Sequence, residues 1–193
     1  MSVSLDDVKK LRDETGVSIM QCKKALEEAD GDFEKARVIL RKVSAQIAEK
    51  KADRELGAGA VQAYVHAGNS VAGVVVLSCE TDFVAKNEEF VALAKDIAMH
   101  VAAMAPQFIN KDDVTDDDIA AAKEVFKEEV KDKPEELQDK ILEGKINSYL
   151  EDKVLTEQAF IKDPSKKIKD LISEATQKFG ERVEITTAQR FSV

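Results

Sequence analysis

Residues 72–87 read AGVVVLSCETDFVAKN, and the elements on either side of this stretch decide the fold. Its first half is a short apolar run rich in β-branched residues, which predicts a buried strand ending at Cys79. Downstream, apolar residues recur at helical spacing and predict an amphipathic helix that Pro106 closes: Phe90, Ala94, Ile97, Val101 and Met104. Phe83, next to Asp82, therefore lies at a strand-to-helix junction, where we expect an exposed, wedge-like side chain.

The segments around this junction predict a small antiparallel sheet. Residues 61–66 alternate by face and precede a turn at 67–70, which predicts a β-hairpin with the strand ending at Cys79. The C-terminal residues 182–191 can add a third strand, with these residues expected on one face: Val183, Ile185, Thr187, Gln189 and Phe191. Helical patterns at 115–130 and 142–150, separated by Lys133-Pro134, predict a helical hairpin, and a last helix at 168–179 ends at Gly180. The fold class is α+β, a small antiparallel sheet packed with helices.

The N-terminal part predicts a separate helical unit. Residues 4–44 contain three short helical patterns, with a capping box from Ser18 to Gln21 and a turn at Asp30-Gly31-Asp32 that leads into the third helix. About 40 residues bury little apolar surface, so this bundle is expected either to bury its aliphatic side chains completely or to pack against a partner. We therefore predict two domains: a three-helix docking bundle with a helical linker at 1–52, and a core domain at 53–193.

Charge and composition point to a protein partner. Charged residues make up 35% of the chain and the formal net charge is −9, so a nucleic-acid polyanion would be repelled. The sequence contains no run of about 18 apolar residues and no cleavable leader pattern, so we expect a cytoplasmic protein that neither spans a membrane nor is secreted. Cys22 and Cys79 fall in different predicted elements, outside any paired motif, and are expected to be buried thiols.

Motifs for covalent chemistry do not appear in the sequence. It contains no phosphate-binding glycine loop, metal-ligand cluster or nucleophile elbow, so we expect neither an enzyme nor a cofactor or metal. His100 is expected to be a helix-face histidine satisfied by packing and one hydrogen bond, whereas His66, at a strand end, can contact a partner. The pattern alone leaves two readings open at the junction: Asp82 as a helix N-cap and Phe83 as a core residue, or both as contact residues.

Three ordered motifs resemble the elongation factor Ts family. They read TDFVAKN at 81–87, IAMHVAA at 97–103, and LRDETG with MQCKKAL at 11–16 and 20–26. Shorter landmarks follow in family order and extend the resemblance over nearly the whole chain. Ala159 departs from it, because the family commonly has proline there. The chain also carries one sheet-and-helix core unit, like the short form of the family, whereas longer members carry two.

The resemblance implies a role for specific residues. In the family the Asp-Phe element enters the guanine-nucleotide-binding domain of elongation factor Tu near its magnesium site, and here that element includes Thr81, Asp82, Phe83 and Val84. The N-terminal contact segment matches Leu11, Arg12, Ile19, Met20 and Lys23. In the core, His66, Met99 and His100 are further candidate contacts. The bundle resembles the ubiquitin-associated type.

The resulting hypothesis is a guanine-nucleotide exchange factor that acts on GDP-bound elongation factor Tu. The alternative is a non-catalytic interaction or scaffold module, which would bind without accelerating nucleotide release. A thiol or histidine hydrolase using Cys79 or His100 is a third possibility. A sheet of about three strands is small and leaves edges unpaired, which favours a homodimer over a monomer whose helical hairpin folds back on the sheet.

Overall fold

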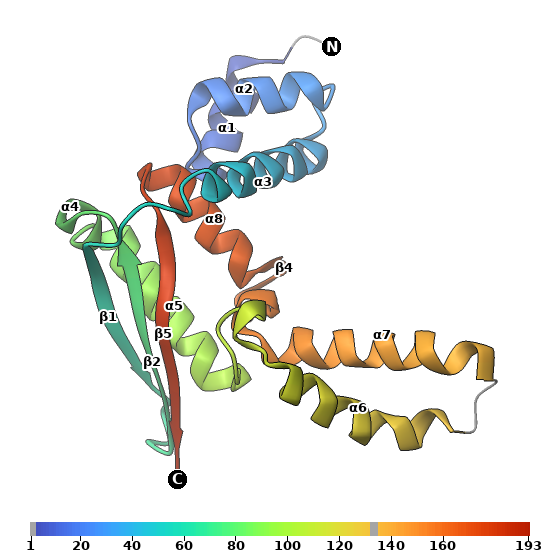
Figure 1. The fold of residues 1–193 in the computed structure, drawn as a ribbon. Coiled ribbons are helices and arrows are strands. Elements are labelled where there is room, and N and C mark those ends of the chain that lie inside the picture. The colour runs from blue at the N-terminus through green and yellow to red at the C-terminus, as the bar shows by residue number, and fades with distance from the viewer. Residues whose placement is uncertain (1–2, 132–134) are drawn as a thin grey trace. The chain divides into compact units, whose positions relative to one another are not determined.

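The computed structural model describes residues 3–131 and 135–193 of the chain. In these residues helices and short strands alternate (Figure 1), in the order α1 (Leu5–Thr15), α2 (Ile19–Glu28), α3 (Phe33–Glu49), β1 (Ala58–Val65), β2 (Val71–Cys79), α4 (Asp82–Ala85), α5 (Glu88–Met104), η1 (Lys111–Asp113), α6 (Asp116–Val130), α7 (Glu135–Lys153), η2 (Leu155–Glu157), β3 (Ala159–Phe160), β4 (Asp163–Lys167), α8 (Ile168–Phe179) and β5 (Val183–Ser192). The predicted α+β class is confirmed.

The residue contacts divide the chain into two compact units. The first contains Met1–Ala60, Leu77–Leu93 and Asp170–Glu184, and the second contains Val61–Val76, Ala94–Lys169 and Ile185–Val193. Strands β1, β2 and β5 and helices α5 and α8 each contribute residues to both units. The predicted domain boundary at residue 52 stays a prediction.

The N-terminal bundle of the first unit has a capping side chain before each helix. The Ser18 cap was predicted as half of a capping box, but Gln21 Oε1 accepts the Ser18 hydroxyl and not the backbone N–H that such a box requires. Ser4, Ser18 and Asp32 precede α1, α2 and α3, and each accepts the backbone N–H three residues later at 3.1, 3.4 and 3.1 Å. Such bonds satisfy amides that have no partner inside the helix. The third helix runs on to Glu49, as the predicted helical linker after residue 44 implies. The bundle core is formed by Val8, Leu11, Val17, Cys22, Ala25, Leu26, Ala29, Ala36 and Leu40.

The three-stranded sheet has the order β1-β2-β5, so the C-terminal strand pairs with β2 as predicted. Gly73 of β2 lets helix α5 approach closely, because a Cβ atom at this position would lie only 2.1 Å from the carbonyl oxygen of Ala98. The residues predicted to share one face of β5 are not covered alike: Val183 and Ile185 are buried, but Phe191 is 54% exposed. Near the end of the strand it is Arg190 that reaches α5, where its Nε donates to the Ala102 carbonyl at 2.9 Å.

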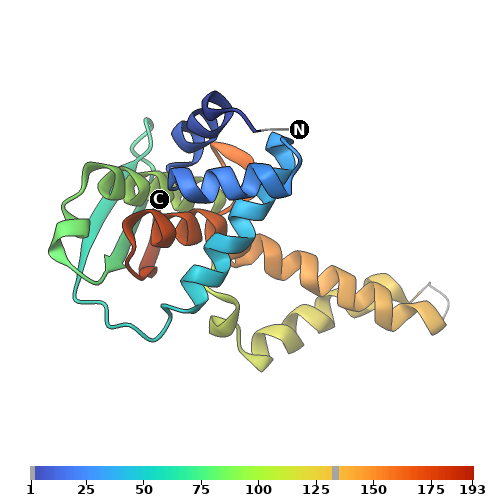
Figure 2. The same cartoon turned by 90° about the horizontal axis from the view of Figure 1, so that it is seen from above.

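The helical hairpin consists of α6 and α7, which lie side by side in both views (Figures 1 and 2). A capping box stands at the start of α6, because Thr115 and Asp118 bond each other's backbone amides. Edge-to-face packing of Phe126 on Tyr149, with ring centroids 5.8 Å apart, joins the two helices. Lys133 and Pro134, the expected break between them, lie outside the described residues.

A two-stranded ribbon, β3-β4, precedes α8 and was not predicted. Buried Glu157 lies beside it, with its carboxylate 3.1 Å from Lys167 Nζ, 3.0 Å from Lys169 Nζ and 3.6 Å from Lys111 Nζ. Burial by itself would raise the pKa of Glu157, but the hydrogen bonds from Lys169 and Lys167 outweigh it and the pKa is lowered. This carboxylate therefore ties η1, η2 and the ribbon together in its charged form.

Candidate partner-binding surface

The wedge segment, Thr81–Val84, begins where β2 ends. Thr81 has extended backbone angles and occupies the cap position of α4, a helix of only four residues. Phe83 is 85% exposed, although a phenylalanine of this size is ordinarily buried. The alternative reading of Phe83 as a core residue is therefore wrong, and Val84 behind it is half-buried.

Asp82 is the first residue of α4 and not its cap, so the expectation of an Asp82 N-cap is also wrong. Its Oδ2 lies 2.6 Å from Lys86 Nζ, one helical turn later. The hydrogen bond from Lys86 and its positive charge lower the pKa of Asp82. The carboxylate is fully exposed, and is therefore a charged group presented next to an exposed aromatic ring.

A second exposed apolar group lies at the start of α2. Met20 is 80% exposed and Ile19 is 54% exposed. Two cations accompany them: Arg12 pairs with Asp13 at 3.2 Å and Lys23 lies 3.7 Å from Glu27, both in exposed ion pairs that contribute little to stability. We call Arg12, Ile19, Met20 and Lys23 the α2 patch. It belongs to the same compact unit as the wedge segment.

Leu11 does not belong to this exposed group. Its side chain is fully buried in the bundle core, so its inclusion among the contact residues is corrected. The threefold apolar spacing of Leu5, Val8 and Leu11 already indicates that Leu11 lies on the inner face of α1. Leu5, which shares this spacing, is nevertheless 75% exposed.

The second unit has a shallow apolar hollow between β1 and α5. Its lining consists of Tyr64, His66, Val71, Met99, Ala102, Ala103 and Ile161. His66 is exposed at its rim, where the Tyr64 hydroxyl lies 3.3 Å from His66 Nδ1. Met99 is half-buried in the wall. The hollow can take an apolar side chain, and its histidine supplies a polar contact beside it.

His100 lies inside the second unit and not in this hollow. It is fully buried, and the backbone N–H of Ile161 donates to its Nδ1 at 3.3 Å. Because Nδ1 is thereby the acceptor, Nε2 carries the proton and donates to Gln158 Oε1 at 2.9 Å. The amide of Gln158 in turn donates to the Asp152 carbonyl at 2.7 Å.

This geometry keeps His100 neutral. Burial lowers the pKa of His100, and the Gln158 hydrogen bond opposes this shift without reversing it. Protonation would also place an N–H on Nδ1, facing the N–H of Ile161. The expectation of a packed, hydrogen-bonded histidine is confirmed, with two partners instead of one. His100 is therefore removed from the candidate contact residues, because no part of its ring is exposed to a partner.

Neither thiol is set up for reaction. Cys22 and Cys79 are buried and unpaired, as predicted. Burial raises the pKa of both thiols, and for Cys79 the nearby carboxylates of Glu181 and Glu80 raise it further. Across residues 3–131 and 135–193, no group of three or more histidine, cysteine or acidic side chains is arranged to hold a metal ion. Over the same residues, no helix has both the length and the apolar character needed to cross a membrane.

Sequence reasoning missed several residues of these surfaces. Lys86 was recognisable from its position four residues after Asp82 on one helix face. Tyr64 was assigned only to a strand, and its place in the hollow depends on the packing of β1 against α5. Gln158 and Glu181 were not recognised at all, because their partners are remote: Gln158 is 58 residues from His100, and Glu181 is 100 residues from Thr81.

Comparison with known proteins identifies the family. The family model "Elongation factor TS" matches residues 27–193. The chain belongs to the elongation factor Ts family. The protein named elongation factor Ts from Thermotoga neapolitana is 46% identical over 193 residues, covering 100% of this chain and 98% of its own length. Its namesake from Thermosipho melanesiensis is 47% identical, with 99% and 98% covered.

The similarity extends beyond these two bacteria. Elongation factor Ts from Thermodesulfovibrio yellowstonii is 46% identical over 194 residues, covering 100% of this chain and 97% of its own length. These relatives are therefore close to this chain in length. Membership of the family makes the chain a translation elongation factor, which acts in protein biosynthesis.

Proposed function

We propose that the chain is the guanine-nucleotide exchange factor for elongation factor Tu. It binds the GDP-bound partner and inserts Asp82 and Phe83 near the magnesium and phosphate site, which opens the site and releases GDP. The observation that carries this proposal is the 85% exposure of Phe83 on a one-turn helix. An exposed aromatic ring contributes little to packing in the free chain, and aromatic residues are enriched among those that carry most of the binding energy at protein interfaces.

The energetics limit what Phe83 supplies alone. A thousandfold acceleration of release requires about 4 kcal/mol of interaction that exists only in the opened state. Burying one phenylalanine supplies about 1.5–3 kcal/mol. The remainder must come from other contacts, for which the α2 patch and the hollow are the exposed candidates. Linkage then requires that GDP weakens the binding of this chain by the same factor as the chain weakens GDP.

The other two surfaces are assigned to docking. Met20 and Ile19 offer exposed apolar area, and Arg12 and Lys23 add exposed positive charge on the same bundle, which suits an amphipathic helix carrying acidic residues. The hollow beside His66 and Met99 suits a single apolar side chain. Nucleotide exchange needs no covalent step, because it requires only that the binding of this chain weakens the binding of GDP.

The test is release of fluorescent GDP from elongation factor Tu, with and without this chain. The proposal expects release to accelerate with the concentration of the chain and to saturate. Binding without acceleration would instead establish the scaffold alternative.

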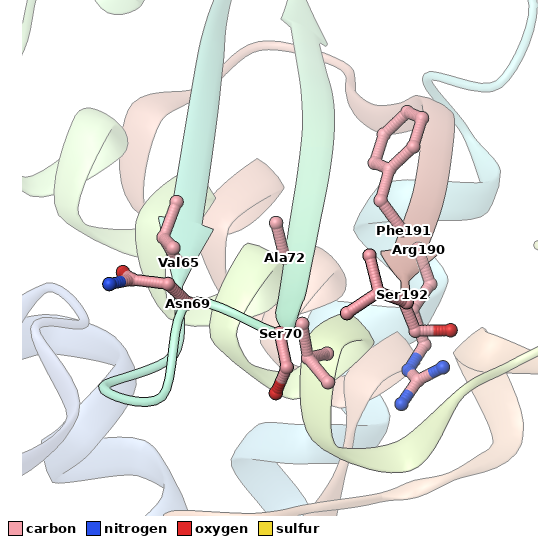
Figure 3. Close-up of a pocket in the computed structure, with 9 residues that line it drawn as sticks. Val65, Asn69, Ser70, Ala72, Arg190, Phe191 and Ser192 are labelled. Atoms are coloured by element: carbon pink, nitrogen blue, oxygen red, sulfur yellow. The ribbon is translucent and has the colours of Figure 1, made fainter.

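We further propose that the chain acts as a homodimer through the sheet face turned away from α5. Tyr64 lines the hollow against α5, so by strand alternation Val61 and Val65 point away from it. Val61 is 65% exposed and Val65 is 57% exposed. Phe191 lies on the same side, because it points opposite to Arg190 (Figure 3), whose guanidinium group bonds α5. This apolar area is continuous with a groove at the end of the sheet, where the β1–β2 turn meets the end of β5.

A second copy is the occupant that fits this face, because a twofold axis matches one apolar sheet face with an identical one. Sedimentation equilibrium at micromolar concentration should give twice the chain mass of 21.3 kDa. Val65→Glu should convert the sample to monomer, whereas Val125→Glu, at an equally exposed valine on α6, should not. A wild-type mass near 21.3 kDa with full exchange activity would refute the dimer.

A further inference from the structure

The wedge segment is held by a carboxylate from a remote part of the chain. Glu181 lies in the short connection between α8 and β5, 100 residues after Thr81. Its Oε2 accepts the backbone N–H of Thr81 at 2.9 Å, and its Oε1 accepts the Thr81 hydroxyl at 2.6 Å. One carboxylate therefore takes both hydrogens that Thr81 can donate, with the short distances typical of charge-assisted bonds.

The connection is reciprocal. Glu80, the residue before Thr81, accepts the backbone N–H of Arg182, the residue after Glu181, at 2.6 Å. This bond is the largest contribution to a lowered pKa of Glu80, and the Arg54 guanidinium at 3.2 Å adds to it. Two neighbouring residues in each segment thus exchange carboxylate-to-amide bonds. We call this arrangement the Glu80–Glu181 clamp.

The turn that carries Glu181 is itself fixed. Gly180 ends α8 with a φ of +72°, a left-handed conformation that favours glycine, and its N–H donates to the Thr176 carbonyl at 3.0 Å. The Gly180 carbonyl accepts Lys51 Nζ at 2.7 Å, and the Thr176 hydroxyl accepts the N–H of Val183 at 3.2 Å. The clamp therefore connects the wedge segment to a well-anchored corner of the first unit.

The position of the wedge depends on the bonds made at Thr81, whose carbonyl also accepts the Cys79 thiol at 3.2 Å. A four-residue helix has no stability of its own. The Thr81 hydroxyl stands at the cap position but makes no capping bond, since it donates to Glu181. Phe83 is too exposed to be located by packing. Its direction is consequently set by the backbone at Thr81, two bonded residues earlier.

We propose that Glu181 is a positioning residue for nucleotide exchange. Through its two hydrogen bonds with Thr81 it fixes the angle at which Phe83 enters the partner. This inference rests on the proposed function of the wedge. It assigns Glu181 no contact with nucleotide or magnesium. Removal of the clamp should leave docking intact and lower the rate of release from the docked complex, because misplacement of a reacting group by about 1 Å can cost about a hundredfold in rate.

The experiment measures fluorescent-GDP release from elongation factor Tu over a concentration series of each full-length variant. Glu181→Ala should lower the maximal release rate about tenfold and leave the concentration for half-maximal release within about twofold. Glu181→Gln should retain most of the rate, because its amide oxygen can accept the Thr81 N–H and its NH₂ can donate to the hydroxyl oxygen. Glu143→Ala, at an exposed glutamate of α7, is the matched control and should behave as wild type.

A double-mutant cycle separates positioning from general weakening. Thr81→Val removes the hydroxyl and keeps the N–H, so it should slow release in the wild-type background but have no further effect in Glu181→Ala. Melting curves on the same samples check that the variants are folded at the assay temperature. Wild-type maximal release by Glu181→Ala, purely additive effects in the cycle, or slowing fully explained by unfolding would each overturn the proposal.

The wedge role of Phe83 and the positioning role of Glu181 can be rejected separately. Loss of release in Phe83→Ala together with normal release in Glu181→Ala would sustain the wedge and reject the positioning role. Normal release in Phe83→Ala would reject the wedge itself, and the positioning role with it.

Discussion

The wedge segment and the His100 site come from two motifs of similar length, and the structure treats them in opposite ways. Phe83 is 85% exposed and unpacked, while its backbone is anchored from behind by Glu181. His100 is fully buried, and both ring nitrogens have partners in Ile161 and Gln158. A motif whose side chains are satisfied internally supports the fold, whereas one that presents unsatisfied apolar surface is available to a partner. Side-chain burial and internal hydrogen bonding thus assign His100 to the fold and Phe83 to partner binding.

The largest expected effect is on the stability of the fold, at buried His100. His100→Ala leaves a cavity and removes the partners of the Ile161 N–H and of Gln158. We expect it to lower the free energy of unfolding by about 2–4 kcal/mol. His66→Ala, at the exposed histidine, should change it by less than about 0.5 kcal/mol. Denaturant unfolding of both variants checks this, and equal losses would show that burial does not distinguish the two histidines.

A smaller effect is expected at Glu157, with a defined pH dependence. Because its pKa is lowered in the folded state, this carboxylate contributes stability above its unfolded pKa of about 4.3, and loses it as pH falls through the folded value. Glu157→Gln should therefore cost about 1–2 kcal/mol at pH 7. The deficit should shrink below about pH 4 as the wild-type group is protonated.

Urea unfolding of wild type and Glu157→Gln between pH 7 and pH 3 measures this difference. Glu143→Gln, at an exposed glutamate of α7, should show no such trend. A deficit that stays constant down to pH 3 would mean that the charge on Glu157 contributes nothing.

The smallest effect concerns docking by the exposed α2 patch. Met20→Ala should raise the concentration of chain needed for half-maximal GDP release about fivefold, equivalent to about 1 kcal/mol, and leave the maximal rate unchanged. Leu5→Ala changes a side chain of the same bundle that is 75% exposed but lies outside the patch, and should have no effect. Equal shifts in the two variants would show that the α2 patch has no special place in docking.

The elements that were predictable carry strong local signals. The β-branched run before Cys79, the apolar spacing from Phe90 onward and the capping residue Asp32 predicted β2, α5 and the start of α3. Strand β4 was missed because Asp163-Pro164-Ser165 contains no typical strand former, and its pairing with β3 depends on the surrounding fold. Alternation predicts which residues of β5 share a face but not which part of the strand is covered, and of the five residues assigned to that face only Val183 and Ile185 are buried.

In the candidate site, too, sequence signals were found only for features that depend on neighbouring residues. The junction alone left Phe83 open as a core or a contact residue, and the family resemblance favoured contact. The hydrogen bonds from Thr81 to Glu181 span 100 residues and leave no local pattern. The family resemblance predicted Leu11 as a contact residue and the helical spacing predicted it as a core residue. Its burial agrees with the helical spacing.

The most direct test of the account measures melting and GDP release on the same samples of Phe83→Ala. The ring is exposed in the free chain, so its removal should change the unfolding free energy by less than about 0.5 kcal/mol. Truncating a central interface aromatic typically costs about 2 kcal/mol or more, so maximal release should fall about thirtyfold. Leu137→Ala, at an exposed leucine of α7, should change neither quantity. A large loss of stability with normal release from elongation factor Tu would contradict the account, because Phe83 would then belong to the fold and not to the partner.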